Sequence, residues 1–392
     1  MKLGKTAIVA ALGSTQTLAW ASSYYLVAIL GTPITQALGI SGDTVYGLFS
    51  MALLLSAGCS PPVGRLIDRH GGRVILIASS AVLAAGLALL GLAQGVITLA
   101  LAWVVLGVGM AMGLYEPAFA TLTRLYGRDA RASITGITLV AGFASTIGWP
   151  ATAWLTYRFG WRDTCLIWAA VNLLIAMPIN WLTIPRAERQ PLSAEATLAA
   201  APVEPPWGAM PILAFYFCAV AFVTGAMAAH LPRLLETLGA SETAAIAAGT
   251  LVGPAQVAAR LIEFGAFRSL HPVWSARFSA LLHPIGAAFL AYLGPAGITL
   301  FAVAHGAGNG LLTIARGTLP LAIFGPVGYG LRNGLLSIPS RMSLSAAPFL
   351  FGLLLDRIGA LAVLVSAGLC LSAFASLWLL RPPTEAPAVA GE

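Results

Sequence analysis

Long apolar runs are the feature that most limits what this chain can fold into. Runs of about 20 apolar residues, enough for a helix to cross the hydrocarbon core of a bilayer, recur through all 392 residues. We predict twelve membrane-spanning helices at 6–30, 44–66, 73–94, 98–123, 131–156, 163–184, 209–235, 241–264, 275–293, 296–323, 333–355 and 359–380. Because these spans use nearly the whole sequence, we expect an all-α membrane protein without a large soluble domain.

The composition agrees with a chain that mostly faces lipid. Only 9% of the residues are charged and 58% are hydrophobic, whereas a soluble domain carries about 25% charged residues. The net charge of +7 could suggest a nucleic-acid partner. Basic residues also gather in the cytoplasmic loops of membrane proteins, and we prefer that interpretation.

The distribution of basic residues predicts the orientation. Arg158, Arg162, Arg233 and Arg357 fall on one side of the predicted membrane, and the other seventeen of the 21 basic residues fall on the opposite side. This asymmetry predicts an inner-membrane protein with both termini in the cytoplasm. The start of the chain also imitates a secretory signal peptide, but we interpret it as an uncleaved first helix.

The two halves of the sequence repeat. LGIS at 38–41 matches LGAS at 238–241, and RLID at 65–68 matches RLIE at 260–263. GMAMGL at 109–114 and YGR at 126–128 match GAGNGL at 306–311 and YGLR at 329–332 in the same order. We therefore predict two pseudo-symmetric six-helix bundles, 1–184 and 209–380, with a cytoplasmic linker at 185–208 and a disordered tail at 381–392. Repeats of this kind place a substrate site near the midplane between the halves.

A charged motif separates the second and third predicted helices. Residues 64–73 read Gly-Arg-Leu-Ile-Asp-Arg-His-Gly-Gly-Arg. This stretch resembles the G-x-L-x-D-R-x-G-R-R signature of the major facilitator superfamily, with Gly72 replacing one basic residue. The resemblance implies a transporter that works by alternating access.

The same motif predicts a cytoplasmic gate. Arginines on the loop and the next helix can pair with Asp68, and such pairs could latch the two halves together. Arg65 and Asp68 are three residues apart and therefore share a helix face. Their repeat partners Arg260 and Glu263 have the same spacing, so we extend the predicted gate to the second half. The predicted gate residues are Arg65, Asp68, Arg69, Arg73, Arg260 and Glu263. A solvated charged loop is the alternative.

A second resemblance is narrower. Tyr126, Arg131, Gly136 and Pro150 partly follow the helix 5 pattern of the monocarboxylate and oxalate porter branch. That branch's acidic-glycine-tryptophan signature in helix 1 is absent, and Thr17-Leu18-Ala19-Trp20 stands there instead.

Ionisable and polar residues inside a membrane indicate functional sites. Glu116 is the acid that lies well inside a predicted span. It is either a proton carrier or a gate residue paired with a nearby arginine. On the tenth predicted helix, polar residues recur at spacings of four, four and three and define one face. These residues are His305, Asn309, Thr313 and Arg316.

By the repeat, Thr313 corresponds to Glu116, so the two equivalent helices present equivalent faces, which favours a shared cavity over polar helix packing. Arg341, on the eleventh predicted helix, either faces this cavity or reaches the cytoplasmic surface. If Arg316 and Arg341 both face Glu116, the interior is net positive and favours an anionic solute.

Helix 1 supplies a further candidate face. Gln16, Trp20 and Tyr24 are four residues apart and either contact an organic substrate or pack between helices. His230 and His283 lack a partner at metal-ligand spacing, so we expect no metal site.

These features favour secondary transport of a small organic solute, an anion or carboxylate, with protons as a candidate coupling ion. No phosphate-binding loop G-x-x-x-x-G-K-[ST] is present, which argues against ATP-driven transport. Multidrug efflux by proton antiport is the alternative. A membrane-embedded enzyme would need paired acids or a nucleophile with its base. We expect a monomer without a cofactor.

Overall fold

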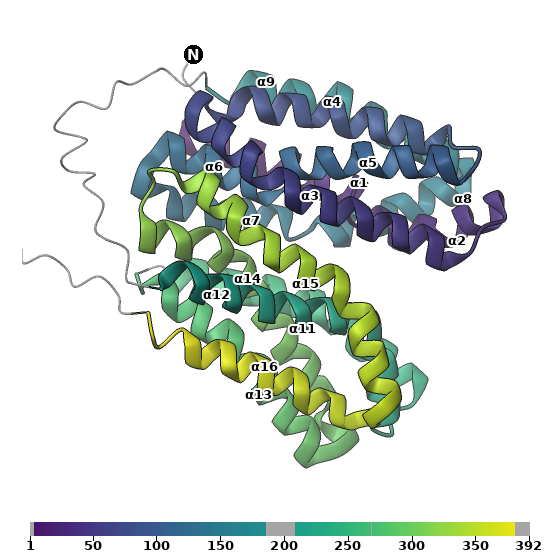
Figure 1. Ribbon diagram of the computed structural model, residues 1–392, viewed down its shortest axis with the longest axis vertical. Helices are drawn as coiled ribbons and strands as arrows, with labels where there is room; N and C mark the ends of the chain where they lie inside the picture. Colours follow the sequence, from purple (N-terminus) through teal and green to yellow (C-terminus); the bar gives the residue numbers. More distant parts are fainter. Residues whose placement is uncertain (1–3, 186–207, 268, 381–392) are drawn as a thin grey trace, which may run out of the picture.

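The computed structural model describes residues 4–185, 208–267 and 269–380, and nearly all of them are helical (Figure 1). The tail expected at 381–392, and the linker expected at 185–208 except for its two end residues, lie outside the described residues. The first half contains α1 (Lys5–Ser22), α2 (Leu26–Leu38), α3 (Gly42–His70), α4 (Gly72–Gly91), α5 (Val96–Gly113), α6 (Tyr115–Tyr126), α7 (Ala130–Ala141), α8 (Ala144–Val171) and α9 (Met177–Thr183). The second half contains α11 (Ala209–Thr237), α12 (Glu242–Gly265), α13 (Pro272–Leu293), α14 (Ile298–Phe324), α15 (Tyr329–Ile358) and α16 (Ala362–Ser376).

The described helices form twelve crossings, several of which are made of two pieces. By length and composition, seven helical segments of the described residues could cross a membrane, and the longest, Val96–Thr183, contains three crossings. A turn at Gly160, whose φ of 82° favours glycine, reverses the chain inside α8. The π-helical turn Asn172–Ala176 then joins α8 to α9.

Three predicted spans need correction. The first, predicted as 6–30, extends to Leu38 and is interrupted between α1 and α2. There the amide of Tyr25 bonds the carbonyl of Trp20 over 3.1 Å, which widens the turn. The fourth, predicted as a continuous helix over 98–123, is broken at Leu114 because Pro117 cannot donate a backbone hydrogen bond. The fifth, predicted as 131–156, is interrupted at Gly142 and Phe143, between α7 and α8. Apolar periodicity does not reveal these breaks.

The repeated L-G-x-S sequences have the same structural role in both halves. Gly39 and Gly239 have φ values of 63° and 90°, the left-handed conformation that ends a helix. Ser41 and Ser241 then accept hydrogen bonds from the amides of Thr44 and Ala244, which caps the next helix. The repeat therefore fixes equivalent turns before α3 and α12.

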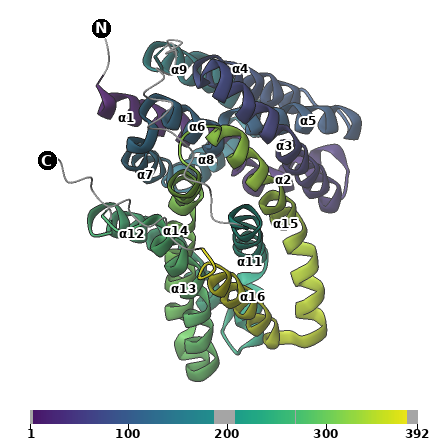
Figure 2. The same cartoon turned by 60° about the vertical axis from the view of Figure 1, so that its left-hand side comes forward.

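Each half has its own apolar core, and the halves form two bodies (Figures 1 and 2). A further cluster joins them, since Leu321 and Tyr329 pack with first-half residues such as Ile67 and Phe119. The main contacts between the halves pair α3 with α15, α7 with α12 and α14, and α6 with α14 and α15.

The halves approach closely at one end of the molecule. A Cβ on Gly64 would lie only 2.0 Å from the carbonyl oxygen of Gly330, so both backbones require glycine here. Gly334 similarly packs against Ser60 and Pro61. We call this the closed end; it carries the start of α1 and of α15, and the halves diverge away from it toward α2 (Figure 1).

Candidate functional site

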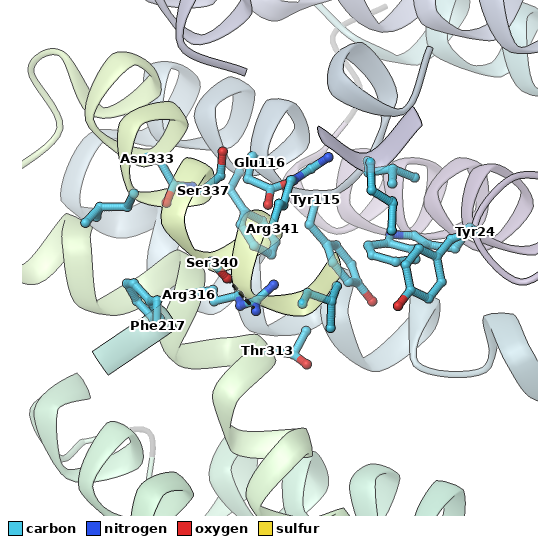
Figure 3. Close-up of a pocket in the computed structure, with 16 residues that line it drawn as sticks. Tyr24, Tyr115, Glu116, Phe217, Thr313, Arg316, Asn333, Ser337, Ser340 and Arg341 are labelled. Carbon is cyan, nitrogen blue, oxygen red and sulfur yellow. Dashed lines mark hydrogen bonds and ion pairs between the residues drawn. The ribbon is translucent and has the colours of Figure 1, made fainter. Parts of the chain in front are cut away.

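A cavity of about 50 Å³, partly open to solvent, lies between the two halves beyond the closed end. It is drawn in Figure 3. First-half helices contribute Trp20, Tyr24, Leu53, Leu114, Tyr115, Glu116 and Phe119. Second-half helices contribute Phe217, Thr313, Arg316, Asn333, Leu336, Ser337, Ser340, Arg341 and Leu344.

The break between α5 and α6 brings Tyr115 and Glu116 to the cavity. Pro117 has no N–H to donate to the carbonyl of Gly113. Gln16 compensates, since its Nε2 donates to that carbonyl over 2.6 Å. The new helix N-terminus also favours a carboxylate in its first turn, which Glu116 supplies. Gln16, a candidate substrate contact in the sequence, is thus buried behind the cavity and stabilises the break between α5 and α6.

Arg341 connects the halves through Glu116. Its Nη2 donates to Glu116 Oε2 over 2.8 Å, and its Nη1 donates to the hydroxyl of Ser56 on α3. Of the two positions considered for Arg341, the structure has the buried one. A buried charge is costly unless paired, so this pair stabilises the arrangement in which the halves are closed here.

Arg316 carries the less engaged charge of the lining. Its Nη2 donates to Ser340 over 2.9 Å, as Figure 3 shows. Its Nε is buried and has no hydrogen-bond partner among the described residues. A guanidinium has five donors in a fixed fork, so Arg316 keeps donors for a bound anion.

Arg260 lies deeper than its predicted gate role suggests. It is buried and donates to Thr313, a cavity residue, over 3.2 Å. It also reaches across the interface to the carbonyl of Thr138 on α7 over 3.4 Å. Gly142 leaves room for it, since a Cβ there would lie 2.2 Å from Arg260 Nη1.

Aromatic rings form the first-half wall of the cavity. The rings of Trp20 and Tyr24 are 5.2 Å apart, and those of Trp20 and Tyr115 are 4.9 Å apart. Tyr115 stacks on Phe119 at 5.3 Å. These separations fall in the favourable range for aromatic pairs, so the wall is internally packed and offers its remaining faces to the cavity.

The four residues of the polar face of α14 lie in two different environments. Thr313 and Arg316 line the cavity, whereas His305 and Asn309 belong to a chain of hydrogen bonds inside the second half. Thr224 bonds Asn309 Oδ1 over 2.6 Å, and Asn309 Nδ2 lies 3.3 Å from His305 Nε2. The chain continues from His305 Nδ1 to His283 Nδ1 over 3.0 Å.

The donors of this chain fix its direction. The amide nitrogen of Asn309 only donates, so His305 Nε2 accepts and its Nδ1–H donates to His283 Nδ1. His283 Nε2–H then donates to Ser366 Oγ over 2.9 Å, and Ser366 donates to the carbonyl of Val363. Both imidazoles are therefore neutral in this arrangement.

Asp68 of the first half binds the backbone of the second half at the closed end. Its two carboxylate oxygens accept from the backbone amides of Gly330 and Leu331 over 2.9 and 2.8 Å. These amides belong to the first turn of α15, where a helix leaves donors free and favours an anion. The expected pairing of Asp68 with arginine side chains is wrong, because no ion pair of the described residues includes Asp68.

Glu263 makes the equivalent contact in the other half. It pairs with Arg131 at the start of α7 over 3.5 Å and accepts from Ser275 over 3.3 Å.

Burial and the nearby Arg131 and Arg277 lower the pKa of His271, the residue before α13. The cation of Arg131 is therefore next to a histidine that stays neutral.

The remaining predicted gate residues lie around these contacts. Arg65 and Arg69 are exposed, and Arg73 donates to the carbonyl of Ile184 within the first half. Asn333, Ser337 and Ser340 line the cavity and were missed. Their spacing of four and three along α15 is the same signal that identified the polar face of α14. No group of three potential metal ligands gathers within the described ranges.

Comparison with known families decides the class of protein. The model of the Major Facilitator Superfamily matches residues 12–304. The chain belongs to this superfamily. It is a multi-pass membrane transporter of small solutes, not an enzyme.

A relative and two solved structures are similar to this transporter. Mouse (Mus musculus) monocarboxylate transporter 11 is 29% identical over 137 residues, which covers 33% of this chain and only 29% of that protein. The human organic anion transporter MFSD10 (TETRAN) superposes with a TM-score of 0.72 at 16% identity and covers 96% of this chain and 100% of that chain. The E. coli fucose:proton symporter FucP superposes with a TM-score of 0.70 at 15% identity, covering 95% and 98%. At these identities the two structures show the shared fold.

Proposed function

We propose that this transporter moves a small organic anion with a carboxylate group across the inner membrane by alternating access, coupled to protons. The observation that carries the proposal is Arg316, whose buried Nε has no described partner at the wall of the central cavity. A planar guanidinium matches a carboxylate with two parallel hydrogen bonds. The partial match to a monocarboxylate transporter supports the same solute class.

The pair of Arg341 and Glu116 suggests how protons enter. The pair joins the halves, so it must separate when the closed end opens. Protonation of Glu116 would release Arg341 without leaving a buried carboxylate unpaired. Arg341 could then share the substrate carboxylate with Arg316. This scheme predicts that a proton and the anion move in the same direction.

The basic-residue asymmetry of the sequence supports the orientation. With the closed end in the cytoplasm, the arrangement described here is an outward-facing state, held by Asp68 against α15 and by Glu263 against Arg131. Opening the cytoplasmic side would require both contacts to break.

Solute uptake into proteoliposomes tests the proposal. Labelled carboxylates should enter, and an inward proton gradient should accelerate their entry. Arg316→Gln should abolish this uptake, whereas Arg233→Gln, which removes an arginine paired with Asp356 elsewhere in the second half, should not. Transport restricted to cationic or uncharged apolar compounds would reject the proposal and favour multidrug efflux.

A further inference from the structure

The two walls of the cavity differ in chemistry and belong to different halves. The first half contributes the rings of Trp20, Tyr24, Tyr115 and Phe119. The second half contributes both arginines, Arg316 and Arg341, with hydroxyl and amide groups from α14 and α15 and the apolar side chains of Phe217, Leu336 and Leu344. Figure 3 shows Tyr24 and Tyr115 on the side opposite Phe217 and Asn333, with Arg316 and Arg341 between them. A solute that bridges the halves must therefore present an anionic group to one wall and an apolar surface to the other.

We propose that the preferred solute is a monocarboxylate whose body is a flat aromatic ring, with the ring against the wall of Trp20 and Tyr115 and the carboxylate on Arg316. This inference rests on the proposed function, because it assumes that a carboxylate is the transported group. What the inference adds is the chemistry of the part of the solute that is not the carboxylate.

The charge of the cavity sets the charge of the solute. Its described lining contains two arginines and one acid, and Glu116 already compensates Arg341. While Glu116 is ionised and paired with Arg341, one positive charge of the lining, on Arg316, is left for the solute. A single carboxylate neutralises it, whereas a second carboxylate would lie in a low-dielectric cavity without a partner.

The rings favour an aromatic body over a bulky saturated one. Trp20, Tyr24 and Tyr115 are only partly buried, so they retain surface toward the cavity. Aromatic rings stack or meet edge to face at 4.5–7 Å, and each such pair contributes about 0.5–1.5 kcal/mol beyond apolar burial, roughly a twofold to tenfold gain in affinity. The indole N–H of Trp20 is also buried without a partner among the described residues, so an oxygen substituent on the ring could accept from it.

The same rings could attract a cation, but the neighbouring arginines oppose this. Arg316 and Arg341 line the same cavity, and like charges repel more strongly in a partly buried site than in bulk water. A positively charged solute would bring a third cation to the site. The charge of the second-half wall therefore selects the anion, and the aromatic wall selects its body.

Calorimetric titration of the purified transporter with four probes tests the inference. The probes are benzoate, cyclohexanecarboxylate, acetate and benzamide. Benzoate should bind about tenfold more tightly than acetate and about threefold more tightly than cyclohexanecarboxylate, and benzamide should bind weakly. Trp20→Leu should abolish the preference for benzoate over cyclohexanecarboxylate. Tyr115→Phe keeps the ring and should retain it.

Trp149→Leu is the matched control, because Trp149 packs on Tyr25 in the same half but does not line the cavity. The Trp149→Leu variant should prefer benzoate over cyclohexanecarboxylate as strongly as the wild type does. Should Trp20→Leu lower the melting temperature, Tyr24→Leu provides a second removal of a ring from the wall. Equal affinities for benzoate, cyclohexanecarboxylate and acetate would overturn the aromatic body and leave the carboxylate proposal standing. Carboxylates that bind no better than benzamide would instead overturn the proposed function, and this inference with it.

Discussion

Arg341 of α15 donates to Glu116 of α6 over 2.8 Å, and the two side chains belong to different halves of the transporter. Neither half can supply this ion pair alone. Both side chains are largely buried, with exposed fractions of 8% and 16%. The pair is therefore a contact whose formation and loss report directly on the movement of the halves.

Replacing Glu116 with glutamine should remove the pH dependence of uptake. In the wild type, lower pH protonates Glu116 and frees Arg341, so uptake should rise as the pH falls. In Glu116→Gln the side chain is always neutral, and uptake should depend much less on pH than in the wild type. The measurement is the initial uptake rate in proteoliposomes at matched external and internal pH. A variant that keeps the wild-type pH profile would exclude Glu116 as the proton-carrying group.

Asp68→Asn should loosen the closed end. A neutral amide has one acceptor oxygen and cannot accept from Gly330 and Leu331 with both of its terminal atoms. In a background without the four native cysteines, a cysteine at Ser60, buried beside Gly334, should then react with a soluble maleimide several times faster. Asp43→Asn, on an exposed residue at the other end of α3, is the control. Unchanged labelling after Asp68→Asn would show that this contact does not hold the halves together.

Gly64→Ala should prevent closure, because the added Cβ would overlap the carbonyl of Gly330. Backbone cannot move aside as a flexible side chain can, so we expect transport to be lost while insertion into the membrane persists. Gly58→Ala on the same helix adds the same methyl group into open space and should transport normally. Wild-type turnover by Gly64→Ala would mean that α3 and α15 need not approach this closely.

The His305–His283 pair should behave as one structural unit. Replacing either residue with glutamine interrupts the chain from Asn309 to Ser366 and leaves a buried donor or acceptor, which costs about 1–3 kcal/mol. The double variant should lose less stability than the sum of the two single variants, because they share the same interaction. Thermal melts of the four proteins measure this coupling, with His70→Gln, on an exposed histidine, as the control. Additive losses would argue against a connected chain.

Cysteine labelling in cells tests the orientation. A cysteine at Ala200, in the predicted linker outside the described residues, should be protected from an impermeant reagent. A cysteine at Gly42, at the start of α3, should react. Periplasmic labelling at Ala200 would reverse the orientation and make the closed end periplasmic.

Much of the fold follows from local sequence patterns. Apolar run lengths predict the twelve crossings, and the L-G-x-S repeat predicts equivalent turns at Ser41 and Ser241. The breaks at Tyr25 and Leu114 could not be predicted in this way. The break at Leu114 depends on compensation from a distant residue, through the hydrogen bond from Gln16 to the carbonyl of Gly113.

The candidate site shows the same division between local and distant information. Helical spacing identified Thr313, Arg316, Trp20 and Tyr24, all of which line the cavity. Spacing alone could not separate them from His305 and Asn309, because one polar face of α14 serves both the cavity and the interior of the second half. Arg260 and Asp68 were predicted from a motif at a helix end. The partners of Asp68 and one partner of Arg260 lie in the other half and are set by tertiary packing.

The affinity of the transporter for a carboxylate and for its matching amide tests the central claim most directly. The claim is that Arg316 recognises a carboxylate in the cavity between the halves. Wild-type protein should bind benzoate at least about tenfold more tightly than benzamide, since a hydrogen-bonded charge contributes about 1.5–3 kcal/mol. Arg316→Gln should reduce this ratio to near one, while Arg233→Gln keeps it. A ratio that is unchanged in Arg316→Gln, or absent in the wild type, would contradict the account.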